Sequence, residues 1–351
     1  MIESVLRRST LRTVRRFAMF QQIGLVLVIL VLCAVLTRFS GTHTDRITGQ
    51  TVSNFLNPNS LTQIFTETSF IGIMAVGVTL VMLSGGIDLS VGSIYALAGV
   101  TAGMVMRQNG LDAPLVALGL SLAVGLGCGL LNGLMVANLH VHPFIITLGA
   151  MWVYRGFAFV ASKAESILLP APVTAFAKAT WASGAPTLVP TAALGLITLV
   201  GAVTMARTVF GRHVIALGSN PDAARYSGLR IPNLLTGVYV LAGATAGISA
   251  FLGAAYYGSA SSGDGDGYEL YVIASAVVGG VSLNGGRGSV VGAFLGALLI
   301  VLIRTGIRVL KLDQNYEWII IGVAIIVAVV LDRLSTHWVQ RNLDAGRATA
   351  A

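Results

Sequence analysis

One carboxylate lies between two long apolar stretches of the chain. Asp88 belongs to the segment Gly-Gly-Ile-Asp-Leu-Ser-Val-Gly-Ser at 85–93, between apolar residues 71–83 and 91–106. An ionised Asp at the centre of a bilayer costs roughly 3 kcal/mol or more unless it faces protein or water, so its position suggests a functional site. The glycines beside it allow a helix to open, which frees backbone groups that only protein or a water-filled cavity can satisfy. The alternative is a short surface turn, where Gly, Asp and Ser are also common.

Two further charged residues lie inside apolar stretches. Arg155 is in the middle of one of them, where its guanidinium must meet a carboxylate, backbone carbonyls or water, and Asp88 is a conceivable partner. Glu67 lies near the start of another stretch, next to Thr66 and Thr68. Its carboxylate either lines a polar path or lies at the membrane surface, and both alternatives stay open at this point.

The composition places the chain in the membrane class. Hydrophobic residues make up 55% of the chain, charged residues 10%, and the mean hydropathy is +0.82, whereas about a quarter of the residues of a soluble domain are charged. Much of the glycine is spaced four residues apart inside apolar stretches, which lets helices approach closely in lipid. These pairs are Gly99 and Gly103, Gly125 and Gly129, Gly243 and Gly247, and Gly292 and Gly296.

Hydropathy predicts an all-α polytopic membrane protein with about ten transmembrane helices, since a span needs about 20 apolar residues. Arg and Lys are more frequent on the side of the N-terminus, which favours cytoplasmic N- and C-termini and accounts for the net charge of +8 without a nucleic-acid partner. We expect a cytoplasmic tail at 1–21, a transmembrane domain at 22–334 and a second cytoplasmic tail at 335–351. The expected spans are 22–36, 61–83, 91–106, 114–137, 143–162, 191–207, 234–257, 268–283, 288–310 and 318–334.

The longest predicted cytoplasmic loop, 208–233, contains signals for a short helix. Asn220 can cap a helix that begins at Pro221, and Gly228 can end it after about two turns. Small residues on this helix could enter a groove of a partner protein, or the helix could be a spacer without a partner. The small residues are Ala223, Ala224 and Ser227.

Metal-binding and catalytic patterns are weak. His140 and His142 are close together but have no Cys, Asp or Glu beside them, so we predict no metal site. Cys33 and Cys128 lie in apolar stretches and predict neither a disulfide framework nor a thiolate site. Residues 259–267 resemble a calcium loop, but the ligand spacing fails, and we predict a flexible periplasmic loop there.

Several motifs together are similar to those of a known family. Besides residues 85–93, they include Asn-Pro-Asp-Ala-Ala-Arg-Tyr-Ser-Gly at 220–228, Gly-Tyr-Glu-Leu at 267–270 and Val-Gly-Gly-Val-Ser-Leu-Asn-Gly-Gly-Arg-Gly at 278–288. Over about residues 61–333 the chain resembles the membrane-permease subunit of the ribose, arabinose and rhamnose class of ATP-binding-cassette (ABC) sugar importers. Shorter matches are Asn132 with Gly133, residues 143–149, and Arg155 with Gly156.

This resemblance implies a multi-pass protein of the bacterial inner membrane and a set of partners. Two permease chains, identical or different, would form the pathway, a periplasmic binding protein would deliver a monosaccharide, and cytoplasmic ATPase domains would bind ATP and Mg²⁺. The implied residues for coupling to the ATPase are Asn220, Asp222, Ala223, Ala224, Arg225, Ser227 and Gly228. Our own candidates for the pathway or the helix break are Gly85, Gly86, Asp88, Ser90, Glu67, Asn132, Thr147 and Arg155.

The chain itself has no phosphate-binding loop of the Gly-Lys-Ser/Thr type, because none of its three lysines stands in such a sequence. We therefore expect no cofactor and no enzymatic activity in this chain, and its energy must come from another chain or from an ion gradient. Two alternatives remain: a permease for branched-chain amino acids, and a self-sufficient secondary transporter in which Asp88, Glu67 and Arg155 form an ion relay. The identity of a sugar substrate is not readable from the sequence.

Overall fold

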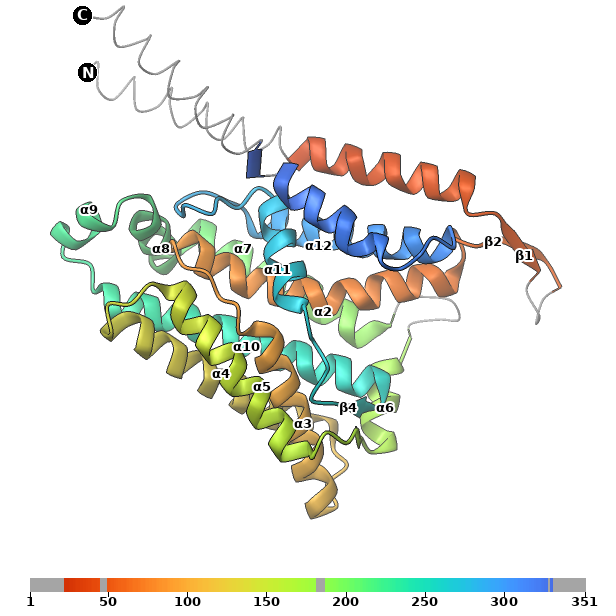
Figure 1. The fold of residues 1–351 in the computed structure, drawn as a ribbon, viewed down its shortest axis with the longest axis horizontal. Coiled ribbons are helices and arrows are strands. Elements are labelled where there is room, and N and C mark those ends of the chain that lie inside the picture. The colour runs from red at the N-terminus through yellow and green to blue at the C-terminus, as the bar shows by residue number, and fades with distance from the viewer. Residues whose placement is uncertain (1–21, 45–48, 181–186, 328, 331–351) are drawn as a thin grey trace, which may run out of the picture.

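The computed structural model describes residues 22–44, 49–180, 187–327 and 329–330, and these fold mainly into helices (Figure 1). The expected tails, 1–21 and 335–351, lie outside the described residues. The helices are Gln22–Phe39, α2 (Pro58–Leu83), α3 (Val91–Asn109), α4 (Pro114–Asn138), α5 (Pro143–Ser162), α6 (Ala171–Lys178), α7 (Leu188–Arg207), α8 (Val209–Ser219), α9 (Pro221–Tyr226), α10 (Ile231–Tyr257), α11 (Tyr268–Val278), α12 (Val290–Val309) and Tyr316–Val327.

Four short strands form two antiparallel ribbons outside the helices. Strand β1 (Thr42–Thr44) pairs with β2 (Thr51–Ser53), and β3 (Ile167–Leu168) pairs with β4 (Ser259–Ala260). The sequence analysis did not predict these ribbons. The β1–β2 ribbon lies at one end of the long axis, and α8 and α9 lie at the other (Figure 1).

Seven helices in the described part of the chain are long and apolar enough to cross a membrane: Gln22–Phe39, α2, α4, α5, α7, α10 and α12. The polytopic class is therefore confirmed, whereas the predicted number of ten is not. The expected span 268–283 is too long, because α11 ends at Val278. Two residues later Gly280 takes a φ of +90°, which turns the chain out of the helix. Of the expected span 318–334, residues 328 and 331–334 lie outside the described residues, and the described helix Tyr316–Val327 is by itself shorter than a full span. Helix α3 has 19 residues but is not among the seven.

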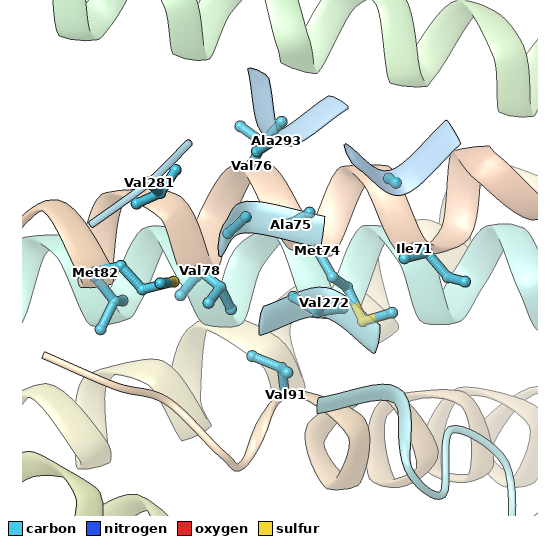
Figure 2. Close-up of a cluster of buried hydrophobic side chains, with 14 of the residues drawn as sticks. Ile71, Met74, Ala75, Val76, Val78, Met82, Val91, Val272, Val281 and Ala293 are labelled. Carbon is cyan, nitrogen blue, oxygen red and sulfur yellow. The ribbon is translucent and has the colours of Figure 1, made fainter. Parts of the chain in front are cut away.

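Helix α2 runs through the centre of the molecule. Residues 70–83 of this helix are buried on every side, as expected for a helix segment that other helices surround. Figure 2 shows Met74 of α2 beside Val272 of α11, with Val91 of α3 below them and Met82 further along α2. All four side chains are essentially inaccessible to solvent, so the first residue of α3 and the middle of α11 share one core with α2.

Glycines set the closest helix contacts. A Cβ atom on Gly125 of α4 would collide with the carbonyl oxygen of Gly243 on α10, and one on Gly129 would collide with the carbonyl oxygen of Tyr239. Gly292 of α12 meets the backbone of Gly279 in the same way. The prediction that the four-residue glycine spacing allows close helix approach is confirmed at these contacts.

Candidate functional site: a broken helix pair and an exposed end helix

The chain between α2 and α3, residues 84–90, leaves the helical conformation. Gly85 takes a φ of +88°, which a residue with a Cβ adopts only under strain. Its N–H donates to the carbonyl of Met82 at 2.9 Å, and Gly86 donates to Val81 at 3.0 Å. Asp88 and Ser90 are fully buried, so the alternative of a surface turn is wrong and the predicted helix break is observed.

A chain of hydrogen bonds leads from Asp88 into two other helices. The Oδ1 atom of Asp88 accepts from the backbone N–H of Ser90 at 2.8 Å and from its hydroxyl at 2.6 Å. The Ser90 hydroxyl in turn accepts from Asn132 of α4 at 2.7 Å. Asn132 accepts from the hydroxyl of Tyr154 on α5 at 2.9 Å. The Oδ2 atom of Asp88 is buried and has no hydrogen-bond partner among the residues that the structure describes.

The open backbone of the break is satisfied by side chains. The carbonyl of Ile87 accepts from the hydroxyl of Thr147 on α5 at 3.1 Å and from that of Tyr239 on α10 at 3.4 Å. A free carbonyl at this depth would otherwise cost several kcal/mol. The structure thus brings together four of the predicted residues, Asp88, Ser90, Asn132 and Thr147. The sequence analysis missed Tyr154 and Tyr239, although a tyrosine hydroxyl inside an apolar helix is itself a sign that it has a polar partner.

Glu67 and Arg155 lie apart from this network. The carboxylate of Glu67 forms a two-bonded ion pair with Arg308 of α12, with N–O distances of 3.0 and 3.1 Å. Arg155 donates to the backbone carbonyls of Ser262 and Asp264 at 2.7 and 2.6 Å. Carbonyls were one of the partners expected for this guanidinium. Asp88, Glu67 and Arg155 therefore bind different groups and do not bind one another.

The end of α11 repeats the end of α2. Gly280 donates to the carbonyl of Val277 at 2.9 Å and Val281 donates to Ala276 at 2.9 Å, which matches the two bonds made by Gly85 and Gly86. The following helix, α12, begins after Ser289, just as α3 begins after Ser90. The molecule therefore contains two helix pairs, each broken by a glycine turn of the same geometry.

Helix α9 has the predicted capping. The side chain of Asn220 accepts from the N–H of Ala223 at 2.9 Å, and Gly228, with a φ of +79°, closes the helix. The loop also contains α8, which the sequence analysis did not predict. Ala224 is 4% exposed and packs against its own chain, so only Ala223 of the two alanines is available to a partner. The most exposed large side chain on α9 is Tyr226, at 91%.

The end of α8 meets the α2 break without intervening side chains. A Cβ atom on Gly218 would collide with the carbonyl oxygen of Leu83 and lie 2.6 Å from the N–H nitrogen of Gly286. That N–H donates to Leu83 at 2.9 Å, and a Cβ atom on Gly285 would lie 2.9 Å from the Cα atom of Gly85. We call this contact of Gly85, Gly218, Gly285 and Gly286 the glycine junction. It connects the loop that carries α9 directly to the glycine turn after α2 and to residues 285–286, which lie between α11 and α12.

The sequence of the chain matches a known protein family. Residues 60–329 match the profile of the permease component of branched-chain amino acid transport systems. The chain belongs to this family. The permease is 37% identical to the ribose import permease of Escherichia coli K12 over 80% of this chain and 87% of the relative. It is 36% identical to the D-allose permease of the same organism over 80% and 85%, and 32% identical to the fructose import permease of Rhizobium meliloti over 82% and 80%.

These similarities confirm the predicted resemblance to sugar import permeases and place the permease in the inner membrane as a multi-pass protein. They also agree with its seven helices of membrane-spanning length. The family description names branched-chain amino acids and the relatives are named for sugars, so the family by itself does not fix the substrate.

Proposed function

We propose that the permease is the membrane subunit of an ABC importer for a monosaccharide. Two permease chains form the pathway, a periplasmic binding protein delivers the sugar, and cytoplasmic ATPase subunits bind ATP and Mg²⁺. The observation that supports this most is the similarity of about four fifths of the chain to permeases named for ribose, allose and fructose. The permease contributes the path and the coupling surface and carries out no chemistry itself.

The proposed topology has ten crossings with both termini in the cytoplasm. In this orientation α8 and α9 are cytoplasmic and the β1–β2 ribbon is periplasmic, in agreement with the separation of these elements along the long axis (Figure 1). The excess of Arg and Lys on the α9 side supports it. The test is a Tyr226→Cys variant without the two native cysteines. A membrane-impermeant maleimide should label it in inside-out vesicles only, and labelling in right-side-out vesicles would refute the orientation.

Helix α9 is the proposed coupling element. Asn220 and Gly228 hold its two ends, while Asp222, Arg225 and Ser227 are exposed on its surface. The small Ala223 side chain and the large Tyr226 side chain are both exposed and can contact a groove of the ATPase. Movement of α9 reaches the turn after α2 and residues 285–286 through α8, because Gly218 contacts the backbone of Leu83 and of Gly286 directly.

The α2 break is proposed to hold the path open rather than to carry ions. The Oδ1 atom of Asp88 accepts both of its hydrogen bonds from Ser90, and Ser90 accepts one from Asn132, so the carboxylate braces the start of α3. A neutral sugar offers no charge for Asp88 to balance. ATP supplies the energy in this proposal, and no relay is needed.

One experiment separates the sugar proposal from its alternative, import of branched-chain amino acids, which the family description favours. The complete importer is purified with its soluble subunits and placed in proteoliposomes. Uptake of labelled ribose, allose, fructose and leucine is then measured with and without ATP inside. We expect ATP-dependent uptake of at least one sugar and none of leucine. Uptake of leucine alone would overturn the proposal.

A further inference from the structure

Arg155 lies deep within α5, on a helix that is otherwise apolar on its outer surface. It follows Pro143 by twelve residues and precedes Ser162 by seven, which corresponds to about 18 and 10 Å along the helix axis. Val153 and Phe157 beside it are 53% and 59% exposed, as expected for side chains in contact with lipid or a second chain. The guanidinium itself is half-buried.

Arg155 holds the segment 261–267 at this depth. Its Nη1 atom binds the carbonyls of Ser262 and Asp264, and the Asp264 carboxylate accepts from the N–H of Ser261 at 2.8 Å. A Cβ atom on Gly265 would lie only 2.8 Å from the carbonyl oxygen of Gly92, in the first turn of α3. The predicted loop at the periplasmic surface is thus wrong in its position, because the segment packs between α3 and the middle of α5.

Three carboxylates accompany Arg155 there. Asp264, Asp266 and Glu269 all interact with it electrostatically. Asp266 is exposed, whereas the Oε2 atom of Glu269 is buried and has no hydrogen-bond partner within the described part of the chain. A Cβ atom on Gly92 would lie only 2.5 Å from that oxygen. We call Arg155, Asp264, Asp266 and Glu269 the polar wall; its formal charge is negative.

Charged side chains exposed at this depth cannot face lipid, since each would cost about 3 kcal/mol or more. They must therefore face water or another protein chain. We propose that the polar wall lines the aqueous pathway and binds the hydroxyl groups of a neutral sugar, and that the second permease chain forms the opposite side. The carboxylates accept and the guanidinium donates hydrogen bonds, and the excess of negative charge disfavours phosphorylated or acidic sugars. This inference rests on the proposed function.

Water access is the first test. In the complete importer, with Cys33 and Cys128 replaced by Ala, the variants Asp266→Cys and Val153→Cys are treated with a charged, water-soluble methanethiosulfonate reagent. Val153 is the control because it lies at the same depth on the outer face of α5. We expect Asp266→Cys to react at least about tenfold faster than Val153→Cys. Equal, slow reaction of both variants would overturn the inference.

Sugar uptake is the second test. Asp266→Asn and Glu269→Gln should each lower ATP-driven uptake by about fivefold or more, because a hydrogen bond from a sugar to a charged group contributes more than one to a neutral group. ATP hydrolysis by the assembled importer should persist. Asp112→Asn, on an exposed turn, is the matched control. Normal uptake by both wall variants would refute sugar binding at the polar wall. A wild-type importer that carries leucine instead would refute the proposed function and leave the reactivity of residue 266 as a separate result.

Discussion

Replacing Gly218 by Ala should uncouple the importer. The new methyl group would collide with the carbonyl oxygen of Leu83 and lie 2.6 Å from the nitrogen of Gly286, so the two backbones must move apart. Overpacking of this kind typically costs roughly 1–3 kcal/mol. Loss of the 2.9 Å hydrogen bond from Gly286 to Leu83 adds roughly 1 kcal/mol. A total of about 2–4 kcal/mol is enough to change the balance between two conformations more than tenfold.

The assay is the number of sugar molecules transported per ATP hydrolysed by the complete importer in proteoliposomes. We expect this ratio to fall about tenfold or more in Gly218→Ala, while the ATPase subunits still bind and basal hydrolysis continues. The control is Gly195→Ala on α7, where a Cβ atom would meet no atom within 4 Å. Thermal unfolding of both variants shows whether the effect is on overall stability.

A normal ratio in Gly218→Ala would refute the reasoning, because it would mean that the glycine junction can open without cost to coupling. A fall in the ratio that is matched by Gly195→Ala would also refute it. Ser219→Ala keeps the close backbone approach at the junction, so we expect it to transport normally.

Three further predictions follow from the same structure. Asp88→Asn keeps an oxygen that can accept both hydrogen bonds from Ser90 and should reduce ATP-driven uptake only mildly. Asp88→Leu leaves both donors unpaired, at a cost of roughly 1–3 kcal/mol each, and should transport poorly at matched membrane levels. Equal and normal uptake by both variants would contradict the bracing role. Ala223→Trp should weaken binding of the ATPase without affecting membrane insertion, whereas Ala224→Trp should destabilise the permease itself, because Ala224 is buried against its own chain. A pull-down of the ATPase and thermal unfolding of the permease distinguish the two effects. The permease alone in proteoliposomes should take up no sugar in response to an ion gradient, and gradient-driven uptake above leak would refute the importer proposal.

Local features of the chain were predictable because they depend on a few neighbouring residues. The capped helix α9 follows from Asn220, Pro221 and Gly228, and the break after α2 follows from glycines beside a buried carboxylate. The length of α11 was overestimated because hydropathy continues through 279–283, although Gly279 and Gly280 are themselves turn signals.

Long-range contacts were decided only by the tertiary structure. Asn132 meets Ser90 because α4 packs beside the start of α3, and Gly218 meets Leu83 because α8 folds back onto the end of α2. The side of α9 that faces its own chain is likewise set by packing, which turned Ala224 inward and left Ala223 exposed. Composition is a property of the whole chain, and caps and glycine turns act over one or two helical turns. The sequence by itself therefore determined the class of the protein and the places where its helices break. Which faces then meet depends on backbone approach in three dimensions, and that brought Arg155 to the carbonyls of residues 262 and 264, more than a hundred positions away.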